Sequence, residues 1–345
     1  MKRLARRGIW LAATLIVLAG CSSKPAPPPW VDDDVTFEAD GVTLYGTYHH
    51  RQGDQPGPAA LLISESGQTD RNGDNAVAGP VANMRKLGDL LAERGVATLR
   101  YDKVGTGRTG LGTYAKHPAD VGSAVYTSGA KAAVRFLAHQ AGTDKDRISV
   151  YALGEGTVHA MNLAVDKSAN APKIHSLGLL QPLAGRYLDQ ITERVRNDAA
   201  SEVKAGRKTQ EEADQVVAAW TAAVVQARHD GTAPAELPDG LGAVLNAKNV
   251  NAVVQADAIN PIALAMLIPA ATPVLLTCSD SDAQADCRLV QPLADALKQT
   301  QLDFVKLTGV SHVLKDDPTD SILNYAKDQP LSPQLVPALD RFASK

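Results

Sequence analysis

Residues 147–165 read RISVYALGEGTVHAMNLAV, an apolar strand-like run that passes through a Gly-Glu-Gly turn into a helical pattern. Arg147–Leu153 leads directly into Gly154, and Val158–Val165 has the composition of a buried helix. Sharp turns of this kind follow the strands of α/β proteins, whose ligands bind at the carboxyl ends of those strands. The stretch therefore predicts an α/β fold and places Gly154 at its functional edge.

Strand-like and helix-like segments alternate on both sides of this turn. Asp40-Gly41 separates two further strand-like runs in a hairpin pattern. The alternation predicts a mostly parallel central sheet with helices on both faces. Only the block 186–260 departs from this alternation, because it is rich in Ala, Gln and charged residues and has few strand-like runs. It predicts a helical cap inserted between two strands. The expected strands are 35–38, 42–48, 59–64, 96–101, 147–153, 175–180, 273–278 and 304–307, and the expected helices are 81–94, 123–139, 158–165 and 289–298.

The composition is that of a globular protein. The chain has 345 residues, of which 44% are hydrophobic and 21% charged. A net charge of −3 argues against a nucleic-acid partner, because nucleic-acid-binding proteins normally carry a basic excess. No cofactor-binding motif and no metal-ligand spacing is evident, so neither a cofactor nor a metal is expected.

The first 20 residues form an expected signal peptide. Four basic residues precede the apolar run Ile9–Ala19, which is too short to span a bilayer comfortably. The run ends in Leu18-Ala19-Gly20-Cys21, which resembles a bacterial lipobox and implies that Cys21 is lipidated and anchors the protein to a membrane. The alternative is an ordinary signal peptide with an incidental cysteine. The basic residues are Lys2, Arg3, Arg6 and Arg7.

Export changes how the rest of the chain is interpreted. Residues 21–34 are expected to be a lipidated, Pro-rich tether, and residues 35–345 the folded domain. Removal of residues 1–20 leaves 31 basic against 38 acidic residues, a net charge of −7. Outside the cytoplasm, Cys278 and Cys287 are expected to form a disulfide, and a zinc pair is less favoured because no further ligand motif accompanies them.

Three segments carry a resemblance to a known family. They are Ser64–Gly73 (SESGQTDRNG), Tyr101–Gly107 (YDKVGTG) and Gly309–Lys315 (GVSHVLK). Together they resemble the α/β-hydrolase superfamily, in particular bacterial serine hydrolases with a GSGPTDRDG-like loop, a YDKRGxGxS-like segment and a late GxxHxxK-like turn. The resemblance covers residues 35–345 and implies a capped hydrolase fold that cleaves carboxylic ester or peptide bonds.

The resemblance also implies positions for the catalytic acid and base. The family places a serine in a G-x-S-x-G turn, followed in chain order by an acid and a histidine. Asp282 matches the acid and His312 the base, while Asp280 stays open as an alternative acid. The acid would orient the histidine, and the histidine would take the serine proton.

The nucleophile is where the sequence departs from the family. A glycine stands at the serine position, Gly154 in the favoured register or Gly156 in the other. The turn can persist without the hydroxyl because glycine tolerates strained backbone. The resemblance assigns the oxyanion hole to the backbone of Glu155 with that of Ser66 or Gly67.

Several functions stay open. Thr157 or Ser66 as a substitute nucleophile, or a water activated by Glu155 with His312, would each permit residual hydrolysis. The favoured interpretation is a membrane-anchored hydrolase relative with weak or absent hydrolysis. The alternative is a non-catalytic envelope binding or accessory lipoprotein that uses the capped pocket for a small lipidic, acyl- or peptide-like ligand.

Overall fold

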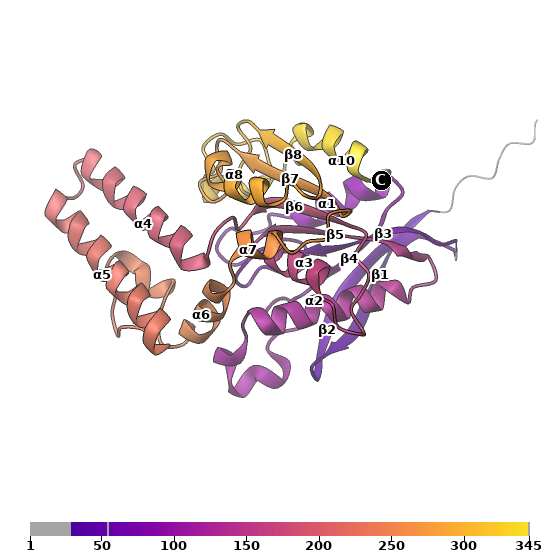
Figure 1. The fold of residues 1–345 in the computed structure, drawn as a ribbon, viewed down its shortest axis with the longest axis horizontal. Helices are drawn as coiled ribbons and strands as arrows, with labels where there is room; N and C mark the ends of the chain where they lie inside the picture. The colour runs from indigo at the N-terminus through magenta and orange to yellow at the C-terminus, as the bar shows by residue number, and fades with distance from the viewer. Residues whose placement is uncertain (1–28, 54, 344–345) are drawn as a thin grey trace, which may run out of the picture.

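One sheet of eight strands forms the centre of the molecule (Figure 1). The structure, a computed structural model, describes residues 29–53 and 55–343; Cys21 and the expected signal peptide lie outside them. The strand order is β1-β2-β4-β3-β5-β6-β7-β8, in which β1, β2 and β4 pair antiparallel and all later pairs are parallel. The strands are β1 Trp30–Ala39, β2 Val42–Arg51, β3 Gly57–Ile63, β4 Ala97–Tyr101, β5 Thr143–Gly154, β6 Ser176–Pro182, β7 Pro273–Ser279 and β8 Gln301–Leu307.

Helices cover both faces of this sheet. The apolar residues of α2, α3 and α8 share one buried cluster with the strands, and those of α1 and α10 share a second cluster. The inner strands are buried on both sides, as continuous apolar runs such as that of β3 require. The fold is therefore a doubly covered α/β sheet. Its helices are α1 Asn83–Glu93, α2 Ser123–Ala138, α3 Gly156–Val165, α8 Cys287–Ala296, α9 Ile322–Tyr325 and α10 Val336–Ala343.

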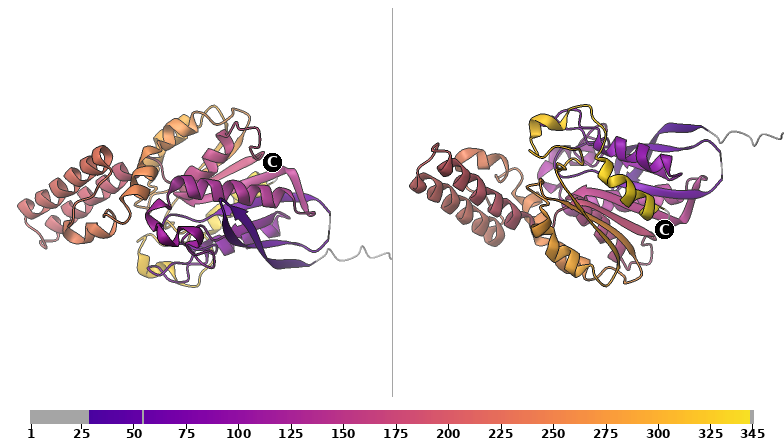
Figure 2. Two further views of the ribbon diagram at one scale, coloured as in Figure 1. Left: turned by 90° about the horizontal axis from the view of Figure 1, so that it is seen from below. Right: turned by 90° about the horizontal axis from the view of Figure 1, so that it is seen from above.

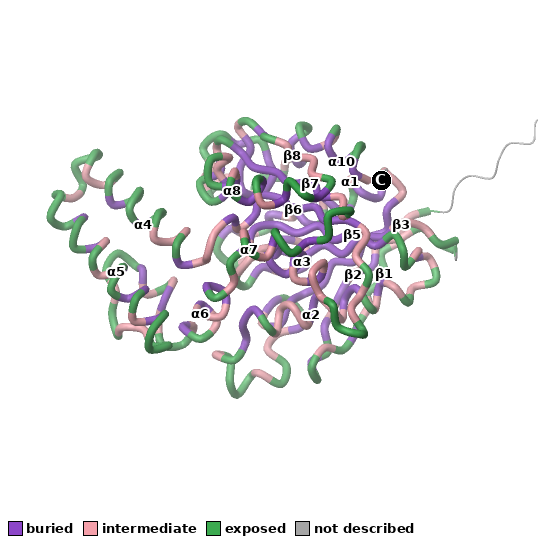
Figure 3. The backbone as a smooth tube through the Cα atoms, viewed as in Figure 1, coloured by how far each residue is buried: buried purple, intermediate pink, exposed green. Residues whose placement is uncertain are grey.

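The insert between β6 and β7 is helical and has a core of its own. Its helices are α4 Tyr187–Lys204, α5 Gln210–Asp230, α6 Val250–Ala258 and α7 Pro261–Ala265. Figure 1 shows α4 and α5 as a hairpin that extends beyond the sheet, and Figure 3 shows burial on the sides of these helices that face each other. Trp220 is fully buried at the centre of this cap, and its indole donates to Thr192 Oγ1 at 2.9 Å.

The folded domain begins earlier than the sequence suggested. The tether was expected to run to residue 34, but β1 starts at Trp30 and pairs along its whole length with β2. Asp32 and Asp33, expected to be a solvated run, contact His49 and His50 across the pair at 2.8 and 2.9 Å. Charged residues suit an edge strand because they discourage pairing with another chain. Figure 2 shows this long two-stranded ribbon on the side away from the cap.

No helix within residues 29–53 and 55–343 is long and apolar enough to cross a bilayer.

Candidate functional site

The turn after β5 holds Gly154 opposite a histidine. Gly154 ends the strand with φ +56°, Glu155 follows, and α3 begins at Gly156. A Cβ built on Gly154 would lie 3.2 Å from His312 Nε2 and 3.2 Å from Glu65 Cβ. The Cα of Gly154 therefore faces the imidazole at close range, and a side chain there would require Glu65 or His312 to shift by a few tenths of an ångström.

Gly156 has different surroundings. A Cβ there would lie 2.8 Å from the Ser64 carbonyl oxygen and 2.9 Å from that of Ile63. Both are backbone atoms at the end of β3, so Gly156 allows α3 to pack closely against that strand. A side chain at position 154 would therefore point at His312, whereas one at position 156 would meet the end of β3.

Asp282 and His312 are brought together although they lie 30 residues apart in the chain. Asp282 Oδ2 lies 2.8 Å from His312 Nδ1, and both side chains are buried. Asp282 Oδ1 accepts from the backbone N–H groups of Gln284 and Ala285, which fixes the carboxylate.

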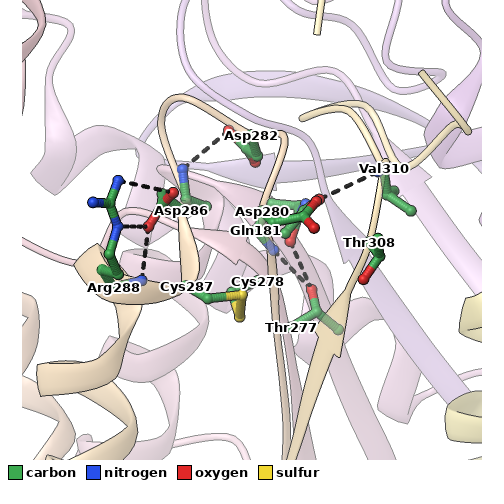
Figure 4. The surroundings of a disulfide bond; sticks show 12 residues. Gln181, Thr277, Cys278, Asp280, Asp282, Asp286, Cys287, Arg288, Thr308 and Val310 are labelled. Carbon is green, nitrogen blue, oxygen red and sulfur yellow. Dashed lines mark hydrogen bonds and ion pairs between the residues drawn. A yellow bond between two sulfur atoms is a disulfide. The ribbon is translucent and has the colours of Figure 1, made fainter. Parts of the chain in front are cut away.

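The alternative acid does not reach the histidine. The Asp280 carboxylate accepts instead from the Gly309 N–H at 2.8 Å and from the Ser281 hydroxyl at 3.0 Å. Figure 4 shows Asp280 and Asp282 at separate places around the loop after β7. The geometry therefore assigns the histidine's partner to Asp282.

The second nitrogen of His312 is also occupied. Its Nε2 lies 2.9 Å from Glu65 Oε2, in the space that Gly154 leaves empty. Burial alone would lower the pKa of His312, but the charge and hydrogen bond of Asp282, joined by those of Glu65, raise this pKa well above its ordinary value. Each ring nitrogen of His312 thus faces a carboxylate oxygen, an arrangement that favours the charged imidazolium over the neutral ring.

Glu65 was missed as a site residue by sequence reasoning, although a signal for it was present. Thr69-Asp70-Arg71 aligns with the TDR of the GSGPTDRDG-like motif, and this alignment places the first glycine of the motif at position 65. The chain thus has glutamate where the motif has glycine. Glu65 and Gly154, far apart in sequence, lie side by side next to His312.

The loop that carries Glu65 is tied to the end of β4. Buried Lys103 donates from Nζ to the carbonyl oxygens of Ser64 and Glu65. Thr69 Oγ1 donates to the Ser66 carbonyl at 2.9 Å. Ser66 and Glu155 both line the cavity described below, while Gly67, with φ +67°, is exposed in the same loop.

The substitute groups considered from the sequence form no hydrogen bond or ion pair with the His312 ring. Thr157 is fully buried, and its hydroxyl donates back to the Gly154 carbonyl at 2.6 Å. Neither Ser66 nor the Glu155 carboxylate hydrogen-bonds to the imidazole among the described residues. Burial raises the pKa of Glu155, while the charge of Lys103 opposes this shift and that of Glu65 adds to it. The carboxylate that does reach His312 is the unanticipated one, Glu65.

A cavity of about 410 Å³ opens above this group of residues. Its floor is formed by Glu65, Gly154, Glu155 and His312, and its walls by the β6–α4 connection, α4 and the start of α8. The volume lies within the range of small-molecule sites. The wall residues that supply apolar surface are Pro182, Leu183, Ala184, Tyr187, Ile191, Ile262, Leu289 and Pro292.

A disulfide closes the loop that carries Asp282. Cys278 in β7 is bonded to Cys287, the first residue of α8, and the loop between them spans nine positions (Figure 4). Asp286 caps α8 by accepting from the Arg288 N–H. The bond therefore fixes both ends of the segment that presents the acid to His312.

Other candidate groups have structural partners. His159 is buried against Thr127, and burial together with the charge of Lys103 lowers its pKa to about 3. In the loop after β3, Asp70 accepts from the backbone of Asn72 and Asp74 and forms an Asx turn. Within the described part of the chain, no three His, Cys, Asp or Glu side chains are grouped so as to hold a metal ion.

Comparison with known proteins defines the fold. No family model matches the chain, and no curated protein matches it by sequence. Among solved structures, the esterase Pf2001 of Pyrococcus furiosus is similar with a TM-score of 0.55 and 15% identity over 94% of this chain and 98% of that one. Est1E of Butyrivibrio proteoclasticus gives 0.54 and 16% over 90% and 96%, and the hypothetical protein PA2218 of Pseudomonas aeruginosa gives 0.54 and 16% over 96% and 100%. The chain has the α/β-hydrolase fold.

Proposed function

We propose that this chain is a membrane-anchored protein of the α/β-hydrolase fold that binds a small acyl- or peptide-like ligand beneath its cap without serine-type hydrolysis. One arrangement carries the proposal. Gly154 stands at the turn where the family has its serine, and His312 is held between two carboxylates. The similarity to solved esterases supports the fold, and the Asp282–His312 contact supports a site derived from that of a hydrolase.

Serine hydrolysis needs two things that this site lacks. One is a hydroxyl beside the histidine, and the other is an unprotonated nitrogen to take the proton. At position 154 there is no side chain, and His312 Nε2 is already paired with the Glu65 carboxylate. Loss of the nucleophile alone costs on the order of 10⁴–10⁶ in rate in enzymes of this type.

Binding needs only the cavity, and the cavity is retained. Its floor offers carboxylate and backbone groups, and its walls offer apolar side chains such as Leu183, Ile191 and Leu289. A ligand with a polar head and a short apolar body matches this distribution. The anchor is proposed to be a lipid on Cys21, on the strength of the lipobox-like sequence before it.

Hydrolysis and binding are tested on one preparation. The chain from Ser22 contains every described residue. We expect it to release p-nitrophenol from short and medium esters, and product from aminoacyl amides, no faster than the His312→Ala variant does. Turnover that is lost in His312→Ala would overturn the proposal.

Binding is measured with non-hydrolysable analogues of the same compounds as a rise in melting temperature. Ile191→Trp, which fills the cavity wall, should abolish the rise. Val225→Trp is the matched control, since Val225 is 61% exposed on α5 outside this cavity. A rise that is equal in both variants would place the ligand elsewhere.

A further inference from the structure

Glu65 occupies space that the absence of a side chain at position 154 creates. A Cβ on Gly154 would lie 3.2 Å from Glu65 Cβ and 3.6 Å from Glu65 Oε2. Contacts of 3.2 Å require a neighbour to move by a few tenths of an ångström. The glutamate and the glycine are therefore a matched pair, and a serine at 154 would meet Glu65 before it met anything else except His312.

The ion pair with Glu65 also determines which proton transfers His312 can carry out. A catalytic histidine accepts the serine proton at Nε2, so this nitrogen must carry a free lone pair. Here Nε2 lies 2.9 Å from a Glu65 carboxylate oxygen, and the negative charge of that group favours a proton on this nitrogen. A serine hydroxyl introduced at position 154 would need to donate its proton to Nε2, but a protonated Nε2 cannot accept it.

We propose that Glu65 is a second, independent block on hydrolysis: a positioning residue that keeps His312 a hydrogen-bond donor and would silence the site even with a serine at position 154. This inference rests on the proposed function, because it presumes that the native site does not hydrolyse. It predicts that activity appears only when both positions are changed together.

The remaining parts of a hydrolase site are in place. Gly154 holds the left-handed turn with φ +56°, and Asp282 holds Nδ1 of the histidine. Asp320 accepts from the His312 backbone N–H at 2.8 Å and from the Ala283 backbone N–H at 3.3 Å. One carboxylate therefore links the loop that carries His312 to the loop that carries Asp282. The aligned motif has glycine at position 65, which makes Glu65→Gly the change that clears the space completely.

The charged and titratable groups around His312 come from three segments. Glu65 faces it from the loop after β3 and Asp282 from the loop after β7. Asp320, which precedes α9, binds its backbone and also accepts from the Tyr325 hydroxyl. Of the three carboxylates, Glu65 alone contacts Nε2, so removal of its charge isolates its effect on that nitrogen.

The restored reaction is ordinary acyl transfer. The introduced hydroxyl oxygen would bond to the ester carbonyl carbon while its proton passes to His312 Nε2. Collapse of the tetrahedral adduct breaks the bond to the leaving alcohol, which takes that proton. Water then attacks the acyl-enzyme with the same histidine as base, releasing the acid and regenerating the hydroxyl.

The experiment compares wild type, Gly154→Ser, Glu65→Gly and the double variant on p-nitrophenyl butyrate. Both single variants should stay at the wild-type background, and the double variant should exceed each by about 10²-fold or more. Addition of His312→Ala to the double variant should return it to background. Thermal melting of each variant verifies that it is folded. A Gly154→Ser variant as active as the double variant, or a folded double variant at background, would overturn the inference.

A second measurement is independent of the double variant. Glu65→Gln keeps the side-chain size and removes the charge, so nitrogen NMR of the His312 ring should show deprotonation at a lower pH than in wild type. An unchanged titration would contradict the role given to Glu65. Failure of the proposed function gives a different result, namely ester turnover by the wild-type protein itself.

Discussion

Gly154 and Gly156 stand two residues apart at one turn, yet a side chain would meet different atoms at each. At Gly154 it would point at the imidazole of His312 and the side chain of Glu65, both of which belong to the site. At Gly156 it would meet the backbone carbonyl oxygens of Ile63 and Ser64 and the Cγ2 of Ile63, at the end of β3. Gly154 thus belongs to the candidate site, whereas Gly156 allows α3 to pack closely on β3. The sequence Gly-Glu-Gly alone does not distinguish these two roles.

Gly156→Ala is expected to destabilise the fold by about 1–3 kcal/mol, because the new methyl group cannot displace two backbone oxygens. The free energy of unfolding in urea measures this cost. Gly242→Ala is the control, since nothing lies within 4 Å of a Cβ built there. Equal stability of the two variants would show that α3 does not pack as closely on β3 as described.

The charge of His312 gives the stability a pH dependence. Its folded pKa is raised above the ordinary 6.5, so the histidine stabilises the fold fully below its unfolded pKa and loses this contribution as the pH rises through the folded value. The difference in unfolding free energy between wild type and His312→Gln should therefore be largest below the ordinary pKa of about 6.5 and shrink as the pH rises through the raised folded pKa.

Urea titrations across this range measure that difference. Comparison with the variant cancels other groups such as Lys315, whose pKa burial and the nearby charge of Lys86 lower to about 8 and whose effect has the opposite sign. A difference that grows with pH would show that His312 is neutral in the folded protein.

The site could be predicted from the sequence only in part. Asp282 and His312 follow buried strands in the order that the family resemblance requires, and the structure brings them into contact. Glu65 sits in a loop between two residues with small side chains, where sequence alone does not tell which way a side chain turns. Its direction depends on the space beside Gly154, which only the three-dimensional arrangement of two strands creates.

The elements that carry the site are the connections after β3, β5, β7 and β8. The disulfide between β7 and α8 closes one of these connections, the loop that holds Asp282. Because the cysteines are nine residues apart in sequence, the chain-entropy model predicts that the bond stabilises the fold by ~2.5 kcal/mol. The bond also restrains the acid in the folded state.

Replacement of both cysteines by serine is expected to lower the free energy of unfolding by ~2.5 kcal/mol. The same variant should broaden the ring signals of His312 in NMR, since Asp282 would be less firmly held. Arg288→Ala, at an exposed residue next to Cys287, is the control that leaves the loop closed. Sharp, unshifted His312 signals in the double serine variant would show that the disulfide is not needed to hold Asp282 beside His312.

The strands and helices were largely predictable, because buried parallel strands have continuous apolar runs. β3, β5 and β7 each begin within four residues of the expected position. The start of β1 was not predictable, because Asp32, Asp33 and Asp34 have the composition of solvated chain. These residues form a strand because they pair with β2, where His49 and His50 contact Asp32 and Asp33.

At the scale of the whole molecule, the cavity and the start of the described chain lie at opposite edges of the sheet. β1 is antiparallel to β2, which is antiparallel to β4, so β1 runs in the direction of the parallel strands. Trp30 therefore lies at their amino-terminal edge, whereas Gly154 and Asp282 lie at or beyond their carboxyl ends. Figure 1 shows the cap and the start of β1 on opposite sides.

This arrangement predicts that the proposed anchor and the pocket work separately. Cys21→Ser should abolish incorporation of labelled palmitate and move the protein from the membrane to the soluble fraction, while ligand-induced melting shifts stay unchanged. Ser22→Ala is the control that leaves the cysteine in place. Retention in the membrane after Cys21→Ser would refute the lipid anchor, and loss of binding would show that the membrane contributes to the site.

The central claim is that the native site holds no reactive serine, and the most direct measurement of it is the intact mass of the wild-type chain after treatment with a fluorophosphonate. The account predicts an unchanged mass, under conditions in which the Gly154→Ser/Glu65→Gly variant gains one adduct that maps to position 154. A single adduct on the wild-type chain, mapped to Ser66 or any other serine and absent in His312→Ala, would contradict it.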